Sequence, residues 1–198
     1  MKLITIAEHT FDESLIHKTS AILDIGCRGF EFSNYFKRLG CNVCPVDIDE
    51  LPLSKEDCEN ILSLEITIGY FKVAICGYTG KCGIEKTNDL QATKIKYGNE
   101  IDCYTLQDFS KENDITFWGI IKMDIEGSEY EVIMSLTEPP ARQLSIEFHL
   151  HTGIYGMGQM REMETKLYAL GYQTIQHELS ERHGAGANYW DSLFILNP

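Results

Sequence analysis

Ala21-Ile-Leu-Asp-Ile-Gly-Cys-Arg-Gly29 is the stretch that decides the fold of this 198-residue chain. Its first five residues are apolar apart from Asp24, which predicts a buried strand over residues 21–25. Gly26 and Gly29 then indicate a tight turn, because glycine adopts backbone conformations that other residues avoid. The stretch therefore predicts a strand that ends in a glycine turn.

A helix and a second strand follow this turn. Apolar side chains recur at helical spacing, at Phe32, Tyr35, Phe36 and Leu39. Gly40 is a typical residue to end such a helix. A second apolar run, 43–46, leads directly into Asp47. Together the two runs predict a strand–helix–strand unit whose glycines let the backbone lie close to a ligand.

The acidic residue after the second strand suggests what this ligand is. A carboxylate at Asp47 can accept hydrogen bonds from both hydroxyls of a ribose. Dinucleotides and S-adenosylmethionine (AdoMet) are both bound in this way. The helix opens with Phe30 and Glu31, which suit a pyrophosphate poorly. Asp24, before the turn, can pair with an ammonium group, which AdoMet has and NAD lacks. The pattern favours AdoMet over NAD(P).

Composition limits the partners. The net charge is −13, so the chain has no broad basic surface, and we expect neither nucleic acid nor a membrane as a partner. We see no signal peptide and no bilayer-spanning run. The seven cysteines are odd in number, and several lie in apolar runs, which predicts reduced thiols in the cytoplasm. Cys41 and Cys44 have a CxxC spacing, but no second pair completes a zinc set.

The rest of the chain alternates strands and helices. Further strands are predicted at 70–76, 101–104, 118–123, 144–150, 172–176 and 192–196. Helices are predicted at 53–62, 106–112 after a Thr105 cap, about 130–136, and 160–170. A hairpin insert is expected at 77–98, and residues 1–20 form a short lead-in with one strand and a partial helix. The pattern predicts one α/β domain over 1–198, with a mostly parallel seven-stranded sheet and an antiparallel last strand.

A second acidic motif follows the strand at 118–123. Asp124 and Glu126 come directly after it and precede a glycine. If this strand lies beside the first one, Asp124 lies next to the positive sulfonium of AdoMet. Glu126 either binds the substrate or accepts backbone hydrogen bonds that tighten the turn. Ser128 and Glu129 suit the following helix N-terminus and are predicted to be structural.

Four motifs together resemble the FkbM-type AdoMet-dependent methyltransferases, which have the class I Rossmann-like fold. They are Leu23-Asp-Ile-Gly, Tyr104-Thr-Leu-Gln-Asp-Phe, Ile121-Lys-Met-Asp-Ile-Glu-Gly-Ser-Glu and Ile146-Glu-Phe-His. The third motif is the most specific. In this family a glycine is usual at the position of Phe30, whereas this chain has Gly29 one residue earlier.

The resemblance implies methyl transfer from AdoMet, with S-adenosylhomocysteine as product, to a hydroxyl of a sugar or other small metabolite. It assigns Asp24, Gly26 and Asp47 to the cofactor, and Asp124 and Glu126 to the active site. Neighbouring positions are predicted to contact the cofactor as well: Cys27, Arg28, Gly29, Ile48, Cys76 and Asp124 itself. A non-catalytic AdoMet- or nucleotide-binding module and an NAD(P)-dependent reductase are the alternatives.

Methyl transfer to a hydroxyl also needs a group that removes a proton. His149 and His151 end the predicted strand at 144–150, and alternation along a strand would point both toward the acceptor. Asp124, Glu126 and His149 together are a conceivable divalent-metal set, although no metal site is predicted. Around the last loop, His183, Tyr189, Trp190 and Asp191 either close over the acceptor or anchor the sheet edge. A homodimer is an open possibility.

Overall fold

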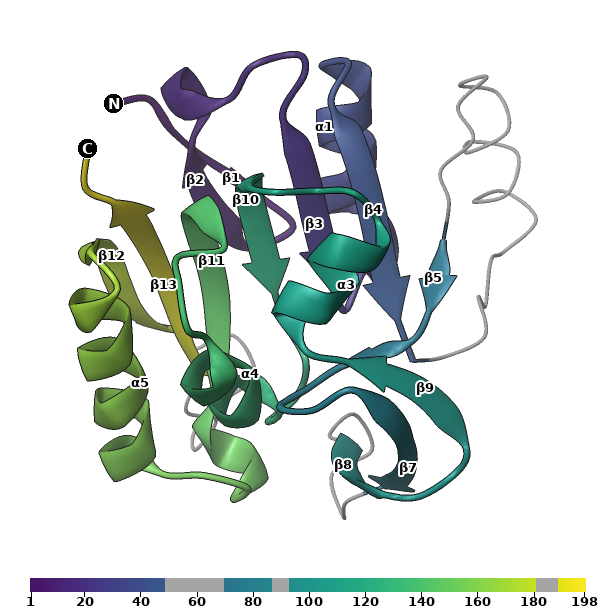
Figure 1. The fold of residues 1–198 in the computed structure, drawn as a ribbon. Helices are drawn as coiled ribbons and strands as arrows, with labels where there is room; N and C mark the ends of the chain where they lie inside the picture. Colours follow the sequence, from purple (N-terminus) through teal and green to yellow (C-terminus); the bar gives the residue numbers. More distant parts are fainter. Residues whose placement is uncertain (49–69, 87–92, 181–188) are drawn as a thin grey trace.

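The computed structural model describes residues 1–48, 70–86, 93–180 and 189–198. Its centre is a seven-stranded sheet in the order β12-β13-β11-β10-β3-β4-β5 (Figure 1). The strands are β3 (Ala21–Ile25), β4 (Asn42–Asp47), β5 (Phe71–Lys72), β10 (Trp118–Met123), β11 (Ala141–His149), β12 (Tyr172–Ser180) and β13 (Tyr189–Leu196). Strands β11, β10, β3, β4 and β5 run parallel to one another, and β13 is antiparallel to both β11 and β12. The predicted sheet, with an antiparallel last strand, is confirmed.

Helices cover both faces of this sheet (Figure 1). They are α1 (Glu31–Arg38), α3 (Leu106–Glu112), α4 (Glu129–Ser135) and α5 (Met157–Ala169). The last three pack on the face that carries Leu23, Ile121 and Ile146, and α1 packs on the opposite face. Thr105 caps α3 as predicted, with its hydroxyl oxygen accepting from the Asp108 backbone N–H at 3.1 Å. The helix predicted at 53–62 lies outside the described residues.

The strand predicted at 70–76 is broken in two. Residues 71–72 form β5 at the edge of the main sheet, whereas β6 (Ala74–Ile75) pairs with β9 (Ile101–Tyr104) in a second sheet. The predicted hairpin insert is confirmed as β7 (Gly80–Lys86) and β8 (Thr93–Tyr97), which complete this second sheet in the order β6-β9-β7-β8. One apolar run therefore supplies strands to two sheets. The spacing of apolar residues in the sequence does not show where the chain passes from one sheet to the other.

The N-terminal segment forms a hairpin, not the single strand that the sequence predicts. It consists of β1 (Leu3–Ile6) and β2 (His9–Asp12), followed by the 3-10 helix η1 (Glu13–Leu15). Ala7 and Glu8, at the turn, have φ of 45° and 70°. Hairpin turns of this kind usually contain Asn-Gly or Asp-Gly. Ala-Glu gives no such signal, which explains the missed strand.

Polar side chains attach the hairpin to the central sheet. The Asp12 backbone N–H donates to Gln143 Oε1 at 2.7 Å, and Gln143 Nε2 donates back to the Asp12 carbonyl at 3.1 Å. His9 Nδ1 lies 3.2 Å from Ser145 Oγ. All four side chains are buried. The lead-in is therefore part of the sheet's packing and places His9 against the middle of β11.

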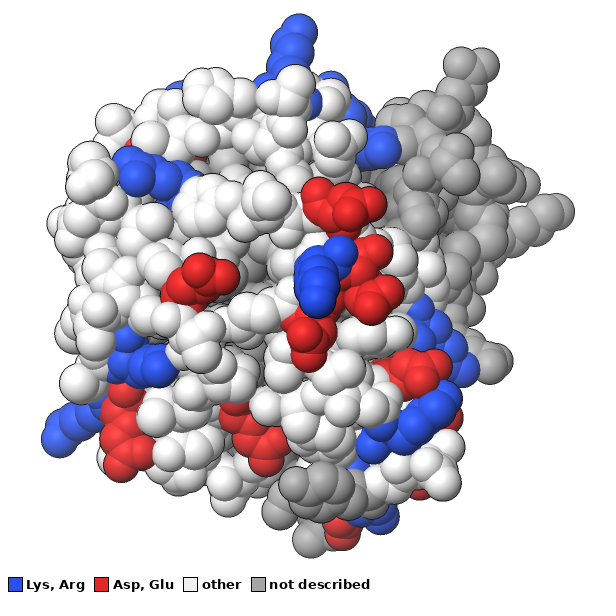
Figure 2. Space-filling model, in the orientation of Figure 1, with Lys and Arg blue, Asp and Glu red and all other residues white. Residues whose placement is uncertain are grey.

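Strand β11 ends at His149, and the 3-10 helix η2 (Leu150–Thr152) follows at once. The prediction that the strand continues to residue 150 is wrong, so strand alternation does not orient His151. On the described part of the face in Figure 2, Lys and Arg side chains are scattered and form no broad basic patch. Among the described helices, none combines the length and the apolar character that a bilayer span requires.

Candidate functional site

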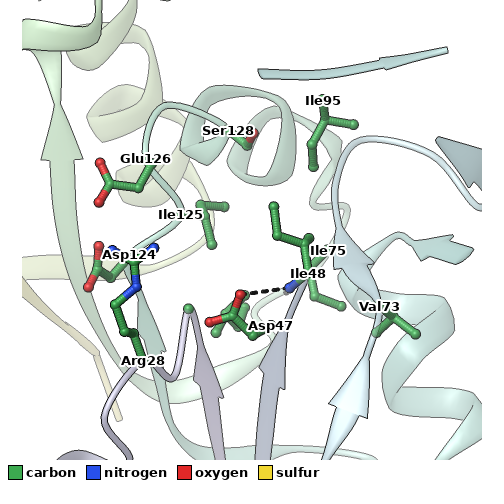
Figure 3. Close-up of a pocket in the computed structure, with 12 residues that line it drawn as sticks. Arg28, Asp47, Ile48, Val73, Ile75, Ile95, Asp124, Ile125, Glu126 and Ser128 are labelled. Atoms are coloured by element: carbon green, nitrogen blue, oxygen red, sulfur yellow. Dashed lines mark hydrogen bonds between the residues drawn. The ribbon is translucent and has the colours of Figure 1, made fainter. Parts of the chain in front are cut away.

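The carboxyl ends of β3, β4 and β10 meet at one pocket (Figure 3). It has a volume of about 680 Å³, including space open to solvent. Its apolar wall consists of Ile25, Ile48, Val73, Ile75, Ile95 and Ile125. Its polar lining is formed by Arg28, Asp47, Asp124, Glu126 and Ser128. Ligands of parallel α/β sheets bind at this edge, so the site lies where the fold predicts it.

Gly26 brings the first turn into contact with the second acidic motif. Its φ is +75°, and a Cβ built there would lie 1.8 Å from the Asp124 carbonyl oxygen. No other residue fits without moving β10. The Gly26 N–H also donates to the Val46 carbonyl at 2.9 Å, which ties the turn to β4. The glycine thus lets three strand ends meet at the pocket.

Phe30 adopts the left-handed conformation that glycine favours, with φ 57° and ψ 11°, directly before α1. Its ring is buried and meets Tyr70 edge-on, with centroids 6.2 Å apart. The family resemblance leads one to expect glycine at this position. The turn keeps a glycine-like backbone here, and burial of the ring offsets the strain.

Asp24 does not line the pocket, so the structure does not support the predicted contact with an ammonium group. The side chain is 1% exposed, and its Oδ2 accepts a 2.6 Å hydrogen bond from the Ser33 hydroxyl. Successive strand residues face opposite sides of a sheet. Since Ile25 lines the pocket, Asp24 points into the interior beneath α1. Of the other predicted cofactor contacts, the pocket lining omits Cys27, Gly29 and Cys76.

Two of these three are buried cysteines. Burial raises the pKa of Cys27 far above the usual thiol range, and it raises the pKa of Cys76 to about 12. Cys76 packs with Cys82 and Cys103 inside the second sheet. These thiols behave as small apolar residues. The pocket lining does include Gly26, Arg28, Asp47, Ile48 and Asp124, and their contact with a cofactor stays a prediction.

Asp47 ends β4 with its carboxylate at the pocket, between the apolar wall and the Gly26 turn (Figure 3). Its Oδ1 accepts a 2.7 Å hydrogen bond from the Ile48 backbone N–H. This bond fixes the carboxylate relative to the Ile48 side chain. An acidic group next to an apolar wall matches a nucleoside, which presents sugar hydroxyls beside a flat ring.

Lys122 is a buried cation beneath the site. No role was predicted for it from the sequence. Its Nζ lies 3.4 Å from both Asp24 Oδ1 and Asp124 Oδ2, and it donates to the Gly26 carbonyl. Burial lowers the pKa of Lys122, but the two carboxylates outweigh it and raise the pKa overall. Burial raises the pKa of Asp124, but the Lys122 charge outweighs this effect and holds the pKa well below its usual value. Both groups are therefore ionised at neutral pH.

Glu129 is the centre of a buried hydrogen-bond network. It is 0% exposed. Its Oε1 accepts from the Ile125 and Gly127 backbone N–H groups at 3.3 and 3.2 Å and lies 2.7 Å from His149 Nδ1. Its Oε2 accepts from the Tyr155 hydroxyl at 2.9 Å. Tightening the turn, one of the two roles considered for Glu126, therefore belongs to Glu129. This Glu also positions a histidine, which the sequence analysis missed.

His149 ends β11 between three carboxylates. Its Nε2 lies 3.4 Å from Asp124 Oδ1 and 3.5 Å from Glu126 Oε2, opposite the Glu129 contact. Burial lowers the pKa of His149, but the Glu129 and Asp124 charges outweigh it and raise the pKa well above its usual value. The structure brings Asp124, Glu126 and His149 together as the sequence predicts. The His151 side chain lies outside the described part of the molecule.

A second buried histidine approaches Asp124 from the other side. His9 Nε2, from the N-terminal hairpin, lies 3.9 Å from Asp124 Oδ2. Here burial dominates and lowers the pKa of His9, so this ring is neutral. The two histidines differ because His149 has a fully buried carboxylate on its other nitrogen, whereas His9 has the Ser145 hydroxyl.

The aromatic residues of the last strand lie near this group. The Tyr189 ring meets the His149 ring edge-on at 5.6 Å, and Trp190 stacks on His177 at 4.5 Å. Trp190 therefore packs against the sheet edge, one of the two roles considered for it. His183 lies outside the described residues.

A family comparison is consistent with this geometry. Residues 6–174 match the family of the methyltransferase FkbM domain. The chain belongs to the FkbM methyltransferase family. It is an AdoMet-dependent methyltransferase, as the four sequence motifs imply. This result favours the methyltransferase over the reductase among the alternatives. A search of curated protein sequences returns no match.

Solved structures support the fold assignment for this FkbM-family chain. TrmK of M. capricolum, solved with S-adenosylhomocysteine, aligns with a TM-score of 0.51 at 14% identity, over 94% of this chain and 69% of that one. The 1,6-didemethyltoxoflavin N1-methyltransferase of Burkholderia thailandensis aligns with a TM-score of 0.51 at 11% identity, over 91% and 72%. It was solved with its substrate and S-adenosylhomocysteine. At these identities the likeness is one of fold.

Proposed function

We propose that this protein transfers the methyl group of AdoMet to a hydroxyl oxygen of a sugar or other small metabolite. The observation that carries the proposal is the meeting of three strand ends at one pocket. Gly26 lies against the Asp124 backbone there, and the Asp47 and Asp124 carboxylates face the same space. When bound, AdoMet supplies an electrophilic methyl group on a positively charged sulfur.

The pocket residues fit this cofactor. Asp47 accepts hydrogen bonds from the ribose hydroxyls, and the apolar wall beside Ile48 and Ile75 holds the adenine. Asp124 supplies negative charge near the sulfonium. Because the product S-adenosylhomocysteine has a neutral sulfur, this attraction disappears after transfer. The charge at Asp124 therefore favours binding of the substrate form of the cofactor over the product form.

The acceptor belongs on the side of Asp124, Glu126 and His149. Transfer to a hydroxyl releases one proton, and these groups surround the position where it leaves. Burial raises the pKa of Glu126 overall, whereas the overall shift in the pKa of Asp124 is downward, and both carboxylates line the pocket. These three polar side chains can hydrogen-bond to an acceptor that carries several hydroxyl groups. Holding the oxygen in line with the methyl–sulfur bond supplies much of the rate enhancement.

Calorimetry with S-adenosylhomocysteine tests the cofactor assignment. We expect Asp47→Ala to weaken binding by about 1–3 kcal/mol, because charge-assisted hydrogen bonds to the ribose are lost. Asp102→Ala is the matched control, since Asp102 is an exposed carboxylate that pairs with Lys81 on the second sheet. Unchanged affinity in the Asp47 variant would contradict the ribose assignment.

The acceptor class is tested by methyl transfer from labelled AdoMet to a panel of sugars, polyols, phenols and amines. We expect product with hydroxyl acceptors, released as a methyl ether. Transfer to amines alone would contradict the proposal of O-methylation. Binding of S-adenosylhomocysteine without transfer to any acceptor would favour the non-catalytic module.

A further inference from the structure

Three ligand atoms converge beside the pocket. Asp124 Oδ1, Glu126 Oε2 and His149 Nε2 lie within 4.8 Å of one another, with the ring nitrogen 3.4 Å and 3.5 Å from the two oxygens. Two ligands bound to one cation at about 2.1 Å lie about 3.0–3.4 Å apart in octahedral or tetrahedral geometry. The spacing is thus close to that of a metal site, and small movements would complete it.

The histidine is positioned as metal-binding histidines are. Its Nδ1 lies 2.7 Å from Glu129 Oε1, which fixes the ring and directs Nε2 toward Asp124 and Glu126. Histidine ligands commonly donate their second N–H to a carboxylate in this way. The Tyr155 hydroxyl holds the other oxygen of Glu129 and accepts from the His149 backbone N–H at 2.8 Å. The ring is therefore held from two sides.

Glu126 provides an independent sign of a missing partner. Its Oε2 is a buried oxygen that accepts no hydrogen bond from any part of the chain that the structure describes. The residue also has a left-handed backbone, with φ 53°. Such conformations are strained in non-glycine residues and are concentrated at functional sites. The carboxylate is held at a strained position, and the ring nitrogen that faces its Oε2 is His149 Nε2 at 3.5 Å.

Two cations, Lys122 and Arg28, lie near this position. Lys122 contacts Asp124 through Oδ2, whereas the three-atom group uses Oδ1. Arg28 reaches beside Asp124 at the pocket (Figure 3). A second group, His9, Asp124 and Glu147, also lies within 4.8 Å, but its residues are on the side of Asp124 that His9 approaches through Oδ2. The Lys122 ammonium already lies 3.4 Å from that oxygen.

We propose that Asp124, Glu126 and His149 bind a divalent cation such as Mg²⁺ or Mn²⁺, and that the acceptor hydroxyl is its further ligand. This inference rests on the proposed function. Coordination lowers the pKa of the hydroxyl, whose proton passes to water at the open side of the pocket. The oxygen then forms its bond to the methyl carbon as the carbon–sulfur bond breaks. The bonding electron pair stays on sulfur, and the cation is unchanged.

The test is to titrate the full chain with Mn²⁺ alone. Calorimetry measures the binding, and the electron paramagnetic resonance signal of free Mn²⁺ gives the unbound concentration. We expect one specific Mn²⁺ per chain, displaced by Mg²⁺. Glu126→Gln retains the side-chain shape but removes a charged ligand, and it should weaken Mn²⁺ binding by at least about tenfold. Glu131→Gln removes the same charge from an exposed position on α4 and should leave the affinity unchanged.

Thermal melting of each variant confirms that it is folded before binding is compared. No saturable Mn²⁺ binding, or equal weakening in the Glu126 and Glu131 variants, would overturn the proposal. Weakening by Glu147→Gln with Glu126→Gln unaffected would place the cation on the other group and overturn it as well. Methyl transfer that persists in excess chelator would refute the metal and leave the proposed function intact. Mn²⁺ binding without methyl transfer to any acceptor would support the metal site and contradict the proposed function.

Discussion

The turn after β3 and the turn after β10 border the same pocket but are built differently. The first has left-handed residues at Gly26, Gly29 and Phe30, and backbone hydrogen bonds such as Phe30 N–H to the Cys27 carbonyl close it. The second turn has left-handed residues at Glu126 and Gly127. The buried Glu129 carboxylate closes this turn by accepting hydrogen bonds from its backbone N–H groups. The first turn therefore depends on the absence of a side chain at Gly26, and the second depends on the presence of the Glu129 side chain.

The largest effect is expected from removing that side chain. Glu129→Ala leaves the His149 ring, the Tyr155 hydroxyl and two backbone N–H groups without their partner. Loss of one member of a buried charged pair costs about 3–5 kcal/mol of unfolding free energy. Urea unfolding measures it, with Glu131→Ala on the exposed side of α4 as control. A loss no larger than that of the control would show that the second turn does not depend on Glu129.

Gly26→Ala tests the first turn. The added Cβ would overlap the Asp124 carbonyl oxygen, so β10 or the turn has to move. Because the φ of Gly26 is +75°, we expect the overlap to cost about 1–3 kcal/mol of stability in addition to left-handed strain of about 1–2 kcal/mol, together with a marked loss of S-adenosylhomocysteine affinity. Gly29→Ala is the matched control, because its φ is +81° but its Cβ meets nothing within 4 Å. It should show only the left-handed strain of about 1–2 kcal/mol. Equal effects in both variants would refute the close-contact explanation.

The smallest effect is expected at Phe30. Phe30→Gly relieves about 1–2 kcal/mol of left-handed strain. It also loses a buried ring worth about 1.5–3 kcal/mol. The unfolding free energy should therefore fall by about 1 kcal/mol, with cofactor affinity preserved. A large loss of affinity would show that the ring shapes the pocket, not merely the turn.

Local patterns were sufficient for the parts of the fold that lie within single segments. The bounds of β3 and β10, the Thr105 cap and the hairpin insert agree with the prediction because each depends on neighbours in the chain. The placement of Asp47, Asp124 and Glu126 at one pocket also followed, since parallel strands end at the same edge of a sheet. The turn type of Ala7 and Glu8 and the split of residues 70–76 were missed because no local signal marks them.

By itself, the sequence determined the strand–helix–strand unit, the family and the acidic strand ends. Only the tertiary structure decided which of those acids meets the pocket, because strands buried on both faces carry no amphipathic pattern to orient them. It turned Asp24 inward to Lys122 and placed Glu129 against His149. It also brought His9 to the site through a contact with Ser145. Those pairings join residues far apart in the chain, and they exist only once the sheet is assembled.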